Sequence, residues 1–201
     1  MTVSIWLCNL THWFCQQKKG LITLKNISIC TPRLEIRYIS LNDSQLLLEY
    51  RGDESVQKFE SFRPETIEEV NGFITENSGD FNVEGTWCQL GVYLNNRLIG
   101  DIGIHFIGPD NEQCEIGYAI NPSSQRQGYG RESVRHVMDY LFRVLKKHRI
   151  AASLHPENIA SIHLLESIGL RREGLFRKSF KNNGVWEDDL IYAILREEWN
   201  F

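Results

Sequence analysis

The clearest pattern of apolar and polar positions lies between residues 114 and 145. Residues 114–120 form a mostly apolar run that Asn121 and Pro122 close, which is typical of a buried strand. After a short polar loop, apolar side chains recur three and four positions apart, as on one face of an amphipathic helix; they are Val134, Val137, Met138, Leu141, Phe142 and Leu145. The pattern therefore predicts a strand, a loop and a helix in succession.

Similar patterns predict the other elements. Residues 34–38 alternate as a first strand, Ser40 and Asp43 can cap a helix running to about residue 50, and Thr66 and Glu69 have capping-box spacing for a helix over 64–75. Further along, we expect a hairpin of 87–94 and 98–106 about Asn95-Asn96, a strand over 149–154, a helix over 158–168, and a hairpin of 172–181 and 185–195 around Asn182-Asn183-Gly184. No repeat or linker interrupts this order, so a single domain over 29–201 is predicted.

The first 28 residues fit this scheme poorly. Residues 3–8 are apolar, and Trp13 and Phe14 continue the tendency before Lys18-Lys19. A signal peptide would need positive charge ahead of the apolar run and a small-residue cleavage site, and residues 1–28 have neither. The apolar run is also too short to span a bilayer. We interpret residues 1–28 as an extension of uncertain order, with an extra strand or a dimer contact as the alternative.

Composition narrows the class of protein. The chain has 201 residues, 42% hydrophobic and 24% charged, which is ordinary for a globular protein, and its formal net charge is −4. Because no basic block is present, a nucleic-acid-coating role is disfavoured. The cysteines are odd in number and scattered, so reduced thiols in the cytoplasm are expected, with neither a disulfide framework nor a metal site; they are Cys8, Cys15, Cys30, Cys88 and Cys114.

The loop between the strand and the amphipathic helix has the chemistry of an anion site. It reads Gln125-Arg126-Gln127-Gly128-Tyr129-Gly130, so Gly128 and Gly130 allow a phosphate to approach the backbone, and Arg126 adds charge at the rim. A Walker loop would need G-x4-G-K-[ST], and a dinucleotide fingerprint would need a glycine where Ser133 stands. Neither nucleotide motif fits.

A second segment strengthens the assignment. After the predicted strand over 149–154, Asn158 is a good helix N-cap and Gly169 a good C-cap. Residues 158–170 read Asn-Ile-Ala-Ser-Ile-His-Leu-Leu-Glu-Ser-Ile-Gly-Leu. Together with the [Gln/Arg]-x-x-Gly-x-[Gly/Ala] loop, this string resembles the GNAT N-acetyltransferases, most closely the RimJ/RimL-like branch. The resemblance covers roughly residues 31–201.

The resemblance implies a fold and a cofactor. We expect the GNAT acyl-CoA N-acyltransferase fold of the α/β (α+β) class, a mixed and mostly antiparallel sheet with helices on both faces, and acetyl-CoA as co-substrate. The backbone N–H of Ile120 would polarise the thioester carbonyl, and Ala119 and Asn121 would bond the pantetheine. The resemblance assigns the remaining cofactor contacts to Gln125, Arg126, Gln127, Gly128, Tyr129, Gly130, Arg131, Asn158 and Ser161.

The amine arrives as an ammonium ion, so a proton acceptor is required. Glu115, on the strand that presents the thioester, is the first candidate, and His105 and Asp101 are weaker ones; His155 and His163 are assigned to local packing. Many GNAT enzymes carry a Tyr seven residues after the Asn as general acid, but Leu165 stands there. Water or Ser161 remains as donor.

These observations predict a cytoplasmic acetyl-CoA-dependent N-acetyltransferase acting on a primary amine, which is a protein N-terminus or a small amine. An aminoglycoside or polyamine acceptor and a catalytically silent CoA-binding module are the alternatives. No nucleic-acid or membrane partner is expected, and the chain is a monomer or homodimer. Phe59, Phe62, Trp87 and Trp186 are candidates to line the acceptor pocket.

Overall fold

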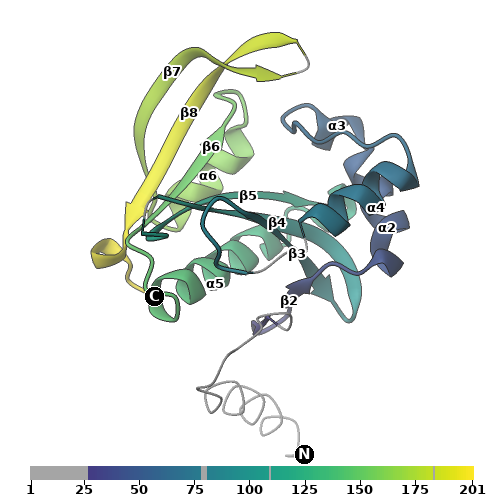
Figure 1. The fold of residues 1–201 in the computed structure, drawn as a ribbon, viewed down its shortest axis with the longest axis horizontal. Coiled ribbons are helices and arrows are strands. Elements are labelled where there is room, and N and C mark those ends of the chain that lie inside the picture. Colours follow the sequence, from purple (N-terminus) through teal and green to yellow (C-terminus); the bar gives the residue numbers. More distant parts are fainter. Residues whose placement is uncertain (1–26, 78–80, 109, 183) are drawn as a thin grey trace, which may run out of the picture.

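The computed structural model describes residues 27–77, 81–108, 110–182 and 184–201. Its centre is an eight-stranded sheet in the order β1-β2-β3-β4-β5-β6-β8-β7, in which only β5 and β6 run parallel (Figure 1). The strands are β1 (Ser28–Cys30), β2 (Glu35–Tyr38), β3 (Trp87–Leu94), β4 (Arg97–Ile107), β5 (Gln113–Ile120), β6 (Arg149–Leu154), β7 (Arg171–Asn182) and β8 (Val185–Leu195).

Helices cover both faces of this sheet. The helices are α2 (Ser44–Arg51), α3 (Glu54–Gln57), α4 (Ile67–Glu76), α5 (Tyr129–Arg143) and α6 (Ile159–Ser167). One core cluster joins α5 and α6 to the sheet through residues such as Val134, Met138 and Leu165. A second cluster, with Leu47 and Val70, joins α2 and α4 to the other face. The predicted mixed sheet with helices on both faces is therefore confirmed.

Local signals place several boundaries. Ser40 and Thr66 each head a capping box, with Asp43 and with Glu69, and α4 begins at Ile67 directly after its cap. Asn95 and Asn96 both have positive φ, 50° and 64°, as a two-residue hairpin turn between β3 and β4 requires. Helix α4 therefore starts three residues later than the apolar pattern predicted, because the cap decides where it begins.

Strand β1 lies at the end of the predicted extension, for which an extra strand was only the alternative interpretation. Ser28, Ile29 and Cys30 pair with Arg37, Ile36 and Glu35 of β2, and Ile27 and Ile29 are buried in the core cluster under α5. Residues 1–26 of the predicted extension lie outside the described residues. Within the described ranges, no helix is long and apolar enough to cross a membrane.

Candidate functional site

Strands β5 and β6 separate part of the way along their length. They pair only over Gln113–Glu115 and Arg149–Ala151, although β5 continues to Ile120 and β6 to Leu154. On its other side, β5 stays paired with β4 as far as Ile120. The second half of β5 therefore offers an open edge toward β6.

The pairing with β4 decides which backbone groups face this open edge. In an antiparallel pair, successive residues point their N–H groups alternately toward and away from the partner. The N–H of Asn121 donates to Ile99 O at 2.9 Å, so Ala119 and Asn121 point toward β4. The N–H groups of Tyr118 and Ile120 then face the open edge. The backbone N–H of Ile120 therefore faces the open edge, as predicted. The pantetheine was expected to bond Ala119 and Asn121, but the N–H groups available to it at this edge are those of Tyr118 and Ile120.

The predicted phosphate loop follows directly. Gly128 has φ of +81°, a left-handed conformation that suits glycine, and it caps α5. The N–H of Glu132 makes the first bond of the helix, donating to Gly128 O at 3.0 Å. The N–H groups of Tyr129, Gly130 and Arg131 therefore stand at the open, positively polarised end of a 15-residue helix.

Side chains hold the loop in this shape. Gln125 Nε2 donates to Ile120 O at 2.9 Å, and Gln127 Nε2 donates to Ser123 O at 3.4 Å. Arg131 Nη2 reaches Ser167 O at 3.2 Å, which joins the start of α5 to the end of α6. The loop is thus tied to the end of β5 and to α6 by the protein's own side chains.

An ion pair that the sequence analysis missed fastens the loop to the start of the sheet. Arg33 Nε donates to Glu132 Oε2 at 2.7 Å, and its Nη1 donates to Gln127 O at 3.0 Å. Partial burial opposes ionisation of Glu132, but hydrogen bonds from Thr31 and Arg33 outweigh it and lower the pKa of Glu132. Arg33 lies nearly 100 positions before its partner, so sequence spacing held no signal for this contact.

A groove of about 510 Å³ runs along the open edge and the loop. It contains most of the predicted cofactor residues, and its lining includes Ala119, Ile120, Gln125, Arg126, Gly128, Tyr129, Gly130, Arg131, Asn158, Ser161 and His163. Gln127 and Asn121 lie beside it, tied into the loop and to β4. The structure therefore brings together residues that the sequence places in two separate segments.

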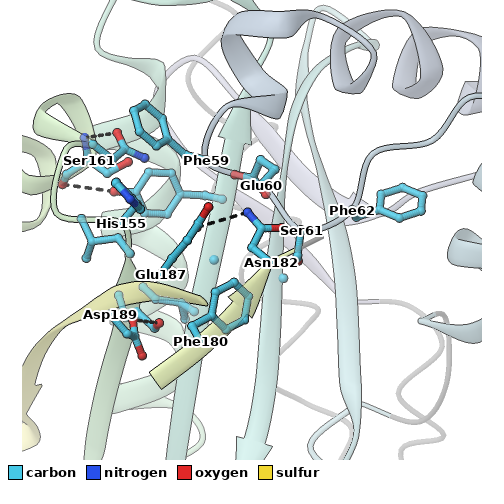
Figure 2. Close-up of a pocket in the computed structure, with 18 of the residues that line it drawn as sticks. Phe59, Glu60, Ser61, Phe62, His155, Ser161, Phe180, Asn182, Glu187 and Asp189 are labelled. Atoms are coloured by element: carbon cyan, nitrogen blue, oxygen red, sulfur yellow. Dashed lines mark hydrogen bonds between the residues drawn. The ribbon is translucent and has the colours of Figure 1, made fainter. Parts of the chain in front are cut away.

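A second cavity, of about 380 Å³, lies between residues 59–62 and the β7–β8 hairpin. Figure 2 shows Phe59 and Glu60 on one side of it and Phe180, Glu187 and Asp189 of the hairpin on the other. Four acidic residues and one arginine, Arg51, are among the residues that line this cavity; the acidic ones are Glu60, Glu187, Asp188 and Asp189. Asp188 is already paired with Lys178, whose Nζ lies 3.5 Å from its Oδ1. Aromatic rings complete the wall, those of Phe59, Phe62, Phe73, Trp87, Tyr118 and Phe180.

Three of the four aromatic residues predicted for an acceptor pocket line this cavity, namely Phe59, Phe62 and Trp87. Trp186 is not among its lining residues; it is 53% exposed on β8, where Lys181 Nζ lies 5.7 Å from its ring centroid. It lies on the outer part of the hairpin.

The groove and the cavity meet at five residues that line both: Phe59, Glu60, Tyr118, Asn158 and Ser161. Only Glu60 and Tyr118 among them have titratable side chains. Burial raises the pKa of Tyr118 well above its usual range, so its hydroxyl is neutral at physiological pH. Desolvation by burial also raises the pKa of Glu60, although the guanidinium of Arg51 opposes this shift.

Beneath the cavity lies a buried polar cluster centred on Asp101. Its carboxylate is fully buried and accepts hydrogen bonds from Tyr50, Arg51 and Gln89. Arg51, with 6% of its side chain exposed, also donates through Nη1 to Glu60 Oε2 at 2.7 Å. Asp101 therefore anchors the cluster and is no longer available to accept a substrate proton.

Glu115 lines neither the groove nor the cavity. It pairs with His105 of β4 and Ala151 of β6, just before β5 and β6 separate. Burial raises the pKa of Glu115, while His105 partly offsets the shift. Along a strand rising ~3.3 Å per residue, Glu115 is roughly 10 Å from Tyr118 and 16 Å from Ile120. His105 also lies outside both linings and stacks on Trp87, with ring centroids 4.6 Å apart.

The second predicted segment begins as expected. Asn158 Oδ1 accepts from Ser161 N–H at 3.2 Å and so caps α6.

His155 lies against Phe59, with ring centroids 5.7 Å apart, and lines the cavity. Leu165 is buried at 1% exposure in the core and reaches the cavity wall, so a hydrocarbon occupies the position of the absent Tyr.

Comparison with known proteins agrees with this geometry. Residues 33–171 match the model of an acetyltransferase (GNAT) domain. The uncharacterized N-acetyltransferase YnaD of Bacillus subtilis (strain 168) is 38% identical over 175 residues, covering 86% of this chain and 99% of YnaD.

Solved structures show the same fold. A GNAT-family acetyltransferase from Bacillus anthracis superposes with a TM-score of 0.77 at 34% identity, covering 86% of this chain and all of the other. Mycobacterium smegmatis RimJ, solved in complex with CoA-disulfide, superposes with a TM-score of 0.75 at 21% identity, covering 86% and 88%. The chain belongs to the GNAT family and is an N-acetyltransferase that uses acetyl-CoA to acetylate an amine.

Proposed function

We propose that the groove holds acetyl-CoA, that the cavity holds the amine, and that acetyl transfer takes place where the two meet. The observation that carries this proposal is that the open edge of β5 passes through that junction, where Tyr118 lines both spaces. A thioester laid along the edge would present its carbonyl carbon to an amine in the cavity. The reaction then needs little more than correct positioning, because the thioester is already activated.

The cofactor contacts follow from the backbone. The pyrophosphate lies at the N–H groups of Gly128, Tyr129, Gly130 and Arg131, with Arg126 at the rim, since the helix end there is positively polarised. The pantetheine runs along β5 as an added strand. The N–H of Tyr118 or Ile120 donates to the thioester oxygen and stabilises the negative charge that develops on it.

The acceptor site favours a cation with a second positive charge. One ammonium group reaches the junction near Glu60, and Glu187 and Asp189 stand at the hairpin end of the same cavity, while Asp188 is already paired with Lys178. The aromatic rings between them attract a cation through their faces. Diamines, polyamines and peptides with a basic residue near the N-terminus have this charge pattern.

The reaction forms a C–N bond and breaks a C–S bond. The neutral amine nitrogen attacks the thioester carbon, and the tetrahedral intermediate collapses with CoA thiolate as the leaving group. The ammonium form of the amine loses two protons in total. One must be removed before attack, and the other ends on the thiolate, whose pKa in a free thiol is about 8.5.

Release of free thiol from acetyl-CoA tests the proposal over matched amines: n-butylamine, putrescine, spermidine, and short peptides with Ala at the N-terminus, with and without a Lys at the third position. We expect kcat/KM for putrescine to exceed that for n-butylamine by about tenfold, since an ion pair worth about 1.4 kcal/mol changes the ratio by that factor. Equal values for the two amines would contradict the role of the hairpin carboxylates.

A further inference from the structure

Four acidic residues line the acceptor cavity, and they differ in which strand or loop carries them and in whether they also line the acetyl-CoA groove. Three come from β8, and each already accepts a hydrogen bond. Asp188 accepts from the Lys178 N–H at 3.0 Å, and Asp189 accepts from the Ser153 hydroxyl. Glu187 accepts from Asn182 Nδ2 at 3.3 Å. Glu60 is the one carboxylate among the four that also lines the acetyl-CoA groove.

Glu60 is held from two sides. Arg63 Nε donates to its backbone oxygen at 3.0 Å, which fixes the loop, and Arg51 Nη1 donates to Oε2 at 2.7 Å, which fixes the side chain. Among the hydrogen bonds of the described residues, those to this carboxylate engage only Oε2. The second oxygen, Oε1, is left to meet an amine. With 27% of its side chain exposed, Glu60 is accessible from the cavity.

The support for Glu60 extends into the core. Arg51 also donates to both oxygens of Asp101, which is fully buried and is bonded in addition by Tyr50 and Gln89. This chain of contacts crosses from α2 to β4 and β3, so the guanidinium has one orientation. A rigid guanidinium places Glu60 at the junction in one geometry.

We propose that Glu60 accepts the proton of the acceptor ammonium at the junction of the two cavities, and that Arg51 and Asp101 are the positioning residues that hold it there. This assignment rests on the proposed function, and it gives Glu60 the role that the sequence pattern predicted for Glu115. Glu60 Oε1 takes one proton from the ammonium and returns it to water. The freed lone pair attacks the thioester carbon, and the second proton of the nitrogen ends on the CoA thiolate.

The surroundings of Glu60 suit a base. The charged and titratable groups around it are Arg51 of α2, Asp101 of β4 and Tyr118 of β5, with Arg63 bonded to its backbone oxygen and His155 beside the neighbouring Phe59. Burial opposes its ionisation, Arg51 favours it and Asp101 opposes it, and the pKa of Glu60 is raised overall. A raised pKa brings a carboxylate closer to the operating pH, where general bases are most effective.

The test compares Glu60→Gln, Glu60→Asp and Glu115→Gln with the wild type, and Glu54→Gln serves as a control because Glu54 is exposed on the adjacent α3. The readouts are acetyl-CoA affinity by calorimetry, thermal unfolding, and the pH profile of kcat/KM with putrescine. We expect Glu60→Gln to bind acetyl-CoA normally and to lose about 10²-fold in kcat/KM at neutral pH. Its rate should then rise about tenfold per pH unit, because only solvent can deprotonate the amine.

Glu60→Asp should keep part of the activity and a pH profile of wild-type shape, since a carboxylate is still present. Glu54→Gln and Glu115→Gln should stay within about threefold of the wild type. A Glu60→Gln enzyme with wild-type turnover, or with lower turnover but an unchanged pH profile, would overturn the proposal. So would a loss confined to Glu115→Gln. Equal turnover of n-butylamine and putrescine by the wild type would refute the acceptor class instead and leave the Glu60 result decisive.

Discussion

Replacing Asp101 by Asn should destabilise the protein strongly, because this side chain organises the polar cluster beneath the acceptor cavity. The carboxylate is 0% exposed and accepts from the hydroxyl of Tyr50, the guanidinium of Arg51 and the amide of Gln89. An Asn side chain keeps one acceptor oxygen, and its NH2 group faces donors where an oxygen stood. Arg51, only 6% exposed, is left with Glu60 as its single carboxylate partner in the cluster.

The size of the effect follows from these contacts. Removing one partner of a buried ion pair typically costs about 3–5 kcal/mol, and the contact that Arg51 keeps with Glu60 places this case near the lower value, about 3 kcal/mol. In a chain of this length each kcal/mol lowers the melting temperature by about 2–4 °C. We therefore expect the melting temperature of Asp101→Asn to fall by roughly 6–12 °C.

Urea unfolding followed by far-UV circular dichroism measures the free energy directly. The slope m should not change, because the surface exposed on unfolding is the same, while the midpoint should fall. Glu49→Gln is the matched control, since Glu49 is exposed on the same helix α2, and it should shift the free energy of unfolding by no more than about 0.5 kcal/mol. A loss below about 1 kcal/mol in Asp101→Asn would refute the view that this pair is buried and tightly coupled.

The remaining predictions concern other parts of the molecule. Gly128→Val should weaken acetyl-CoA binding at least about tenfold by calorimetry while the protein stays folded, because φ of +81° and the phosphate approach both require glycine; wild-type affinity would exclude the loop as the phosphate site. Glu132→Gln should cost about 1 kcal/mol at neutral pH. Because the pKa of Glu132 is lowered in the folded state, its contribution is present above the unfolded pKa and is lost as pH falls through the folded pKa, so wild type and variant should converge in denaturation at acid pH. Leu165→Tyr should leave turnover flat or lower it, since the site is 1% exposed and tightly packed; a several-fold gain at constant KM would show that protonation of the thiolate limits the wild type. Ile29→Ala should cost about 2 kcal/mol in thermal or urea unfolding, since its side chain is 9% exposed in β1; no loss would mean that β1 is not part of the folded sheet.

Elements with local signals could be predicted closely. The capping box of Thr66 and Glu69 and the Asn95-Asn96 turn each act over four residues or fewer. The physical reason is that caps and turns are satisfied by near neighbours in the chain. Strand β1 and helix α3 were missed because they have three and four residues, too few to show a period, and they form only when packed on β2 and α2.

The phosphate loop and the acceptor cavity also differ in how far the sequence could predict them. The phosphate loop is one contiguous segment with a helix behind it, so its glycines and spacing were visible in the sequence. The acceptor cavity is assembled from residues 59–62, the open half of β5 and the β7–β8 hairpin, and the first and last of these segments lie more than 100 positions apart. Its residues have no fixed spacing, so the four aromatic candidates were chosen by residue type alone, and three of them line the cavity.

The sequence by itself therefore determined the order of the longer elements, the family and the segment that meets the cofactor, because their signals lie in near neighbours along the chain. Only the tertiary structure decided which backbone N–H groups face the gap between β5 and β6, because the register with β4 sets that alternation. The sequence pattern pointed to Glu115 and held no signal for Glu60. Only the folding of α2 and the loop after it over the sheet carries Glu60 to the junction of groove and cavity.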